Sequence, residues 1–190
     1  MIKNLSILVI VVAIAVSGYF VYPTFYTNEN QNLMGKTMEE RFDYLSNNGN
    51  SACSGSFKDS IMTMADSENI MGSCCSKMLM HRYQEQVSGL EKYRDIKEIP
   101  PDPYNVDAGL AKEMVGYYDV PLSSEEQAAY DYAMDNSHEK GPCCCKCWRW
   151  YVYGGLGKYL IKEYKFTGEQ ITELWDISDG CGGDGHNGHG

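Results

Sequence analysis

Positive charge is scarce in this chain of 190 residues: 16 Lys and Arg stand against 26 Asp and Glu, for a formal net charge of −10 at pH 7. A protein that binds nucleic acid needs a basic face for the phosphates, so this balance excludes nucleic acid as a partner. The hydrophobic fraction of 43% is normal for a globular protein and excludes wholesale disorder. The chain is long enough for one well-buried domain with appendages.

Signatures of common enzymes are also missing. We find no paired carboxylates, no glycine-rich phosphate loop, no Ser/His/Asp arrangement of a hydrolase and no internal repeats. No Cys-x-x-Cys lies in a βαβ setting, which disfavours a thiol–disulfide oxidoreductase. No Cys-x-x-Cys-His is present either, which disfavours a c-type haem protein. The sequence therefore favours a binding protein over an enzyme.

Charge is absent from one long segment at the N-terminus. No charged residue occurs between Lys3 and Glu29, and residues 5–22 are apolar or small. As a helix these residues would rise about 27 Å, enough to span the hydrocarbon core of a bilayer. We predict a membrane anchor within residues 1–27 that leaves the bulk of the chain outside the cytoplasm. The alternative is a cleaved signal peptide with a site at Ala15-Val16-Ser17, which would also export the body.

Helix signals dominate the remainder. Capping boxes begin at Thr37, Ser123 and Thr167, where a hydroxyl residue precedes Glu or Gln by three positions, and Asp107 is a further N-cap. We predict an all-α fold: a single Cys-rich domain of about six helices over residues 28–181, as hydrophobic periodicity suggests. Residues 182–190 are rich in Gly and His and predict a flexible tail.

A further helix is predicted to start at Ser73 and to continue to about Ile96. On such a helix Cys74 and His81 would share one face, and Cys75 would lie on the neighbouring stripe. The dipole at the helix start would favour the thiolate of a cysteine in the first turn. These three residues are therefore candidate contributors to a thiol site.

The most unusual stretch is residues 141–150, which reads GPCCCKCWRW and holds four of the eight cysteines. The spacing Pro-Cys-x-Cys-x-Cys, from Pro142 to Cys147, resembles the motif for which the PCYCGC-motif family of exported bacterial proteins, often lipoproteins, is named. Cys144 and Lys146 stand where the family name has Tyr and Gly, and no lipid-attachment cysteine is present. The resemblance implies export and a thiol site, and it supplies no reaction.

Geometry restricts how the motif can bind an ion. In a continuous helix Cys143 and Cys147 share a face and Cys145 points to the opposite side. The three thiols can converge only if the helix begins inside the run, at about Cys145. A hairpin of the two closing helices would return Cys181 to this loop, and Cys144 is expected to stay bridged or idle.

The predicted function is binding or carriage of a soft metal ion outside the cytoplasm, with copper(I) or zinc(II) as the cofactor. The predicted ligands are Cys143, Cys145, Cys147 and Cys181, with Cys74, Cys75 and His81 as contributors. The membrane and a metal donor or acceptor protein are the predicted partners. Two alternatives stay open: a structural or interaction domain stapled by four disulfides, and a thiol–disulfide redox protein. In a mixed outcome Cys53 would bridge Cys74 or Cys75 and leave the C-terminal cysteines free for metal.

Overall fold

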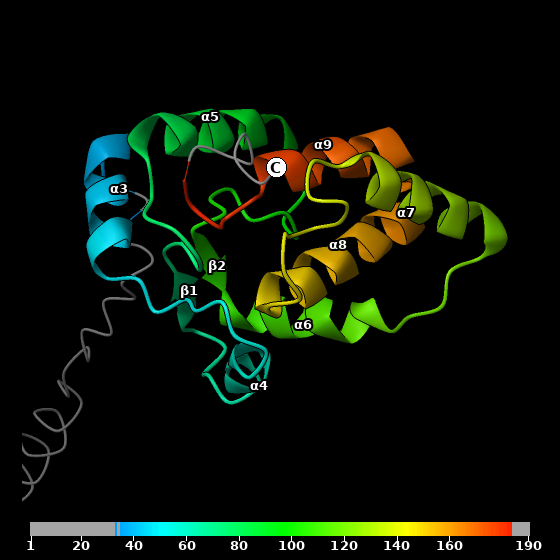
Figure 1. Ribbon diagram of the computed structural model, residues 1–190, viewed down its shortest axis with the longest axis horizontal. Helices are drawn as coiled ribbons and strands as arrows, with labels where there is room; N and C mark the ends of the chain where they lie inside the picture. Colours follow the sequence, from blue (N-terminus) through cyan, green and yellow to red (C-terminus); the bar gives the residue numbers. More distant parts are fainter. Residues whose placement is uncertain (1–32, 34, 184–190) are drawn as a thin grey trace, which may run out of the picture. The chain divides into compact units, whose positions relative to one another are not determined.

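The computed structural model describes residue 33 and residues 35–183 (Figure 1). The predicted membrane anchor and most of the predicted tail, residues 184–190, lie outside this part of the chain. Among the residues that are described, no helix is both long and apolar enough to cross a bilayer. The elements below all belong to one unit that begins at Lys36.

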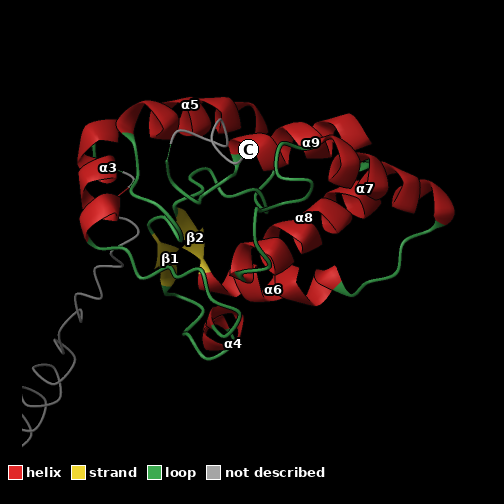
Figure 2. Ribbon diagram, in the orientation of Figure 1, coloured by secondary structure: helices red, strands yellow, loops and turns green. Residues whose placement is uncertain are grey.

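The described chain is mostly helical, as predicted. Its seven α-helices are α3 (Met38–Asn47), α4 (Phe57–Ile61), α5 (Met80–Leu90), α6 (Ala108–Tyr118), α7 (Ser124–Asn136), α8 (Trp148–Tyr164) and α9 (Gly168–Ile177). One turn of 3₁₀-helix, Glu91–Tyr93, follows α5. Two short strands, β1 (Asn69–Met71) and β2 (Asn105–Asp107), complete the list, and Figure 2 draws the long loops between the elements.

Helix starts follow the local capping chemistry. The side chains of Thr37, Ser123 and Thr167 each accept a hydrogen bond from the backbone three residues on, and the Glu or Gln there bonds back. Asp107 caps α6 by accepting from the amide of Leu110 at 2.8 Å. Each of these caps satisfies amides that the first helical turn leaves unpaired. The four predicted starts are confirmed.

Helix α8 runs through the centre of the core. Trp148, Val152, Leu156 and Leu160 recur every fourth residue and are all buried. The glycines of α8 permit close helix contacts: a Cβ on Gly155 would lie 1.8 Å from the carbonyl oxygen of Met114 in α6. Only a glycine fits there, because the two backbones touch.

The two strands correct the all-α prediction in detail. They pair antiparallel, with Ile70 opposite Val106, and both of these side chains are fully buried. Three residues are too few to display the period-2 alternation by which strands are recognised in a sequence. The pair is small, but it positions the start of the loop that follows β1.

That loop overturns the prediction of a helix starting at Ser73. Residues 72–79 are not helical, and α5 begins only at Met80. The amides of Cys74 and Cys75 bond instead to the carbonyls of Gly180 and Cys181. Long-range backbone pairing therefore replaces the local helix, and Cys74 and His81 do not share a helix face.

Candidate metal centre

Four loops that are far apart in sequence supply the eight cysteines. Cys53 precedes α4, Cys74 and Cys75 follow β1, and Cys181 follows α9. The loop before α8 carries the remaining thiols: Cys143, Cys144, Cys145 and Cys147. All eight cysteines are free thiols.

Backbone hydrogen bonds join three of these loops, those that carry Cys53, Cys74 with Cys75, and Cys181. The amide of Cys53 donates to the carbonyl of Cys74 at 3.1 Å, and the amide of Cys74 donates to Gly180 at 3.2 Å. The amide of Ser76 donates to the carbonyl of Cys181 at 2.7 Å. Pairing of this kind ties the three loops together without a regular sheet and sets the positions of their four thiols.

The inner thiols are Cys74, Cys143, Cys147 and Cys181. The Sγ atom of Cys143 lies 3.6 Å from that of Cys147 and 3.4 Å from that of Cys181. Cys181 in turn lies 3.8 Å from Cys74, sulfur to sulfur. Cys143, Cys147 and Cys181 are at most 3% exposed, whereas Cys74 is half-buried. Core side chains therefore shield this half of the cluster from water.

The outer thiols are Cys53, Cys75, Cys144 and Cys145. All are exposed except Cys145, which is half-buried. The Sγ atoms of Cys53 and Cys145 are 2.9 Å apart, and Cys144 lies 3.6 Å from Cys181 of the inner set. The outer thiols thus connect the buried thiols to solvent.

The sulfur atoms form four groups of three, and within each group every pair lies within 4.8 Å. The groups are Cys53, Cys145 and Cys147; Cys74, Cys75 and Cys181; Cys75, Cys144 and Cys145; and Cys143, Cys144 and Cys181. Three thiolates at this separation could hold a soft metal ion. The residues present therefore fit a thiophilic ion.

The segment of the Cys-x-Cys-x-Cys motif differs from the prediction in where its helix begins. Helix α8 begins at Trp148 with Cys147 as its N-cap, three residues later than the predicted start at Cys145. Residues 142–147 are consequently non-helical, which lets Cys143 and Cys147 meet while Cys145 joins Cys53 and Cys147. Cys144, expected to be idle or bridged, lies in two of the four groups.

Hydrogen bonds between the inner thiols shift their pKa values in opposite directions. Hydrogen bonds from Cys143, Cys147 and Cys181 hold the pKa of Cys74 far below its usual range. The same kind of contact, with Cys147 and then Cys181, raises the pKa of Cys143. A metal ion that binds these sulfurs would displace the protons that the thiols carry.

Buried polar side chains hold Cys181 in place. The amide of Cys181 donates to Asp179 Oδ1 at 3.0 Å, and Gln86 in α5 donates a short hydrogen bond to the carbonyl of Asp179. Tyr104 completes the chain, its hydroxyl donating to Gln86 Oε1 at 2.8 Å. These supports come from distant segments and carry no motif, so the sequence did not predict them.

Arg149, the second residue of α8, lies beneath the inner thiols. The side chain is 1% exposed, and its guanidinium donates to the carbonyl of Pro103 at 2.6 Å and stacks on Trp148 at 4.6 Å. A Cβ on Gly180 would lie only 2.0 Å from Cζ of Arg149, so the guanidinium packs directly against the backbone next to Cys181. The sequence alone does not reveal that Arg149 is buried beside the cysteines.

Comparison with models of protein families, with curated proteins and with solved structures finds no match to this chain. The chemistry of the site therefore rests on its own geometry.

His81 does not join the thiols. It is exposed on the first turn of α5 and belongs to none of the ligand groups found among the described residues. The predicted ligands that do come together are the six cysteines of that set, and Cys53 and Cys144 extend the cluster to eight. The sequence signal for Cys53 and Cys144 is the presence of eight cysteines in one chain, which suggests that all of them take part.

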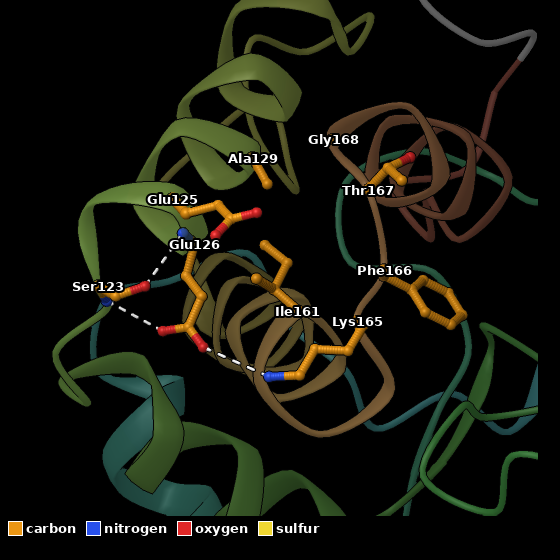
Figure 3. A pocket seen from close by; sticks show the side chains of 9 residues that line it. All are labelled: Ser123, Glu125, Glu126, Ala129, Ile161, Lys165, Phe166, Thr167 and Gly168. Carbon is orange, nitrogen blue, oxygen red and sulfur yellow. Dashed lines mark hydrogen bonds and ion pairs between the residues drawn. The ribbon is translucent and has the colours of Figure 1, made fainter.

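A pocket of about 510 Å³ lies away from the cysteines (Figure 3). It is formed by the start of α7, the end of α8 and the start of α9. Glu126 faces Lys165 across it at 3.8 Å and accepts from the amide of Ser123 at 3.0 Å. These contacts serve the capping of α7, and no cysteine lines the pocket. The thiol cluster is therefore the candidate functional site.

Proposed function

We propose that this protein binds a soft, thiophilic metal ion, copper(I) or zinc(II), among its cysteines and acts as a binding or carrier protein. The observation that carries the proposal is the convergence of all eight thiols from four separate loops. Three of these loops are joined by backbone hydrogen bonds, and the fourth, which precedes α8, brings four more thiols to the same place. Thiolates select copper(I), zinc and iron–sulfur clusters over hard cations.

The division into inner and outer thiols supports carriage as well as binding. The inner thiols are shielded by the core, which would protect a bound ion from water. The exposed outer thiols, Cys53, Cys75 and Cys144, can exchange ligands with a donor or acceptor protein. An ion would then pass inward from one three-sulfur group to the next.

Location outside the cytoplasm is part of the proposal. The apolar residues 5–22 support a membrane anchor or an export signal. The resemblance of residues 142–147 to the PCYCGC motif agrees with export, since that family is exported. A membrane-bound site facing outward would meet metal ions that arrive from the environment or from a partner protein.

Structural disulfides are the competing function. The observation in their favour is the 2.9 Å separation of the Cys53 and Cys145 sulfurs, since exported thiols that lie this close readily oxidise. Oxidation of all eight thiols would leave four bridges and no metal ligand. The same pairs, if reversibly oxidised, would suit a redox protein.

The test is metal content and thiol state measured on one anaerobic preparation of the full chain. We expect a thiophilic metal in elemental analysis, and thiols that resist alkylation until a chelator removes the metal. The mass of the unreduced protein provides the second arm. A mass eight hydrogens below that of the reduced chain, with no metal, would establish four disulfides and overturn the proposal.

A further inference from the structure

Neighbouring three-sulfur groups share members. Cys75, Cys144, Cys145 and Cys181 each belong to two groups, whereas the other four cysteines each belong to one. Every group is linked to another through a shared sulfur, so the eight thiols form one connected set.

Shared sulfurs are the geometry of bridging thiolates. A thiolate has lone pairs enough to bind two soft ions at once, and a group of three sulfurs suits the three-coordinate copper(I) ion. Structural zinc, by contrast, prefers four ligands in a tetrahedron. We propose, building on the metal-binding function above, that the eight thiolates hold four copper(I) ions as a single sulfur-bridged cluster.

The charge of the filled cluster calls for a positive neighbour. When four copper(I) ions bind, the eight thiols release their protons to solvent, and copper keeps its oxidation state. Eight negative sulfurs and four positive ions leave a formal charge of −4. Two tetrahedral zinc(II) ions on the same eight thiolates would leave the same charge of −4. Either filling calls for a positive partner, and the grouping of the sulfurs in threes is what favours copper(I).

Arg149 is that partner. It is fully buried, and its Nε and Nη1 atoms have no hydrogen-bond partner among the described residues. In this part of the chain it also forms no ion pair with a carboxylate. A buried cation without a partner is costly. An anionic cluster beside Gly180 and Cys181 would supply the missing countercharge.

The experiment is an anaerobic titration of the full chain with copper(I), followed by native mass spectrometry. We expect four ions at saturation and an X-ray absorption spectrum that contains a copper–copper scattering path. Saturation at one ion would overturn the cluster and leave the proposed metal-binding function standing. Binding of no copper and no zinc would overturn both.

Two exposed cysteines provide a matched pair of variants. Cys53 belongs to one group and Cys144 to two, and both side chains face solvent, so Ser replaces either without disturbing the core. We expect Cys53→Ser to lose one ion and Cys144→Ser to lose two. Equal losses in the two variants would contradict bridging by Cys144. Circular dichroism of both variants verifies that the fold is retained.

Discussion

The Sγ atoms of Cys143 and Cys181 lie 3.4 Å apart, although 38 residues and two helices separate them in the chain. Helices α8 and α9 carry the chain out and back, and Cys181 returns beside the loop that precedes α8. This contact joins the motif run to the C-terminal loop. The inner half of the candidate metal site depends on this connection.

Replacement of Cys181 by Ser should therefore damage metal binding. Cys181 belongs to two of the three-sulfur groups. Substitution of a residue that only supports a metal ligand typically lowers metal affinity about 10-fold to 100-fold. We expect the loss of the ligand Cys181 to lower the affinity for copper(I) by at least this much. His81→Ala is the control, because His81 lies outside the groups and should leave affinity unchanged. Competition with a chromophoric copper(I) chelator measures both, and equal affinity of the two variants would remove Cys181 from the site.

Arg149 should matter through its charge as well as its shape. Arg149→Met removes the buried cation, and Arg149→Lys keeps a positive charge while losing the planar fork. We expect the Met variant to bind copper(I) more weakly than the Lys variant. Competition with a chromophoric copper(I) chelator measures the affinity of both variants. If Met and Lys weaken copper binding equally, Arg149 acts by packing alone.

Metal affinity should rise with pH. Partial burial raises the pKa of Cys145, and hydrogen bonds with Cys147 and Cys181 raise that of Cys143. These thiols are protonated at neutral pH, so a metal must displace their protons, and lower pH favours the metal-free form. Each displaced proton should change the affinity roughly tenfold per pH unit. Chelator competition between about pH 6 and pH 8 measures the slope, and a flat profile would show that the thiols are not the ligands.

Glycine at position 155 should be indispensable to the fold. Gly155→Ala would force a Cβ to within 1.8 Å of the Met114 carbonyl oxygen and push α6 from α8. We expect a loss of about 1–3 kcal/mol or more in the free energy of unfolding. Gly116→Ala in α6, the helix that Gly155 of α8 contacts, is the control, because a Cβ at position 116 meets nothing within 4 Å. That variant should gain up to about 1 kcal/mol from helix propensity.

Chemical denaturation of the two variants and the parent chain measures these differences. A Gly155→Ala protein as stable as the parent would mean that α6 and α8 separate at little cost.

Local chemistry made part of the fold predictable. The capping boxes at Thr37, Ser123 and Thr167 involve residues three apart, so the signal is complete within a short window. The predicted helix at Ser73 failed because Cys74 and Cys75 pair with residues 180–181, more than a hundred positions away. Propensity within a window cannot anticipate a partner at that distance.

The candidate site was predictable in kind and in most of its members. The density of cysteines at residues 143–147 and the return of Cys181 followed from spacing and from the helix hairpin. The contributions of Cys53 and Cys144, and the burial of Arg149 beside Gly180, depend on loop packing that leaves no local signal in the sequence. The sequence predicts a thiol site, and the structure supplies its extent.

The most direct test is X-ray absorption at the metal edge of the full chain purified anaerobically. We predict a first coordination shell of sulfur alone, since the described ligand groups contain only cysteines. A shell of nitrogen and oxygen, or a preparation with no thiophilic metal and fully oxidised thiols, would contradict metal binding by the thiol cluster.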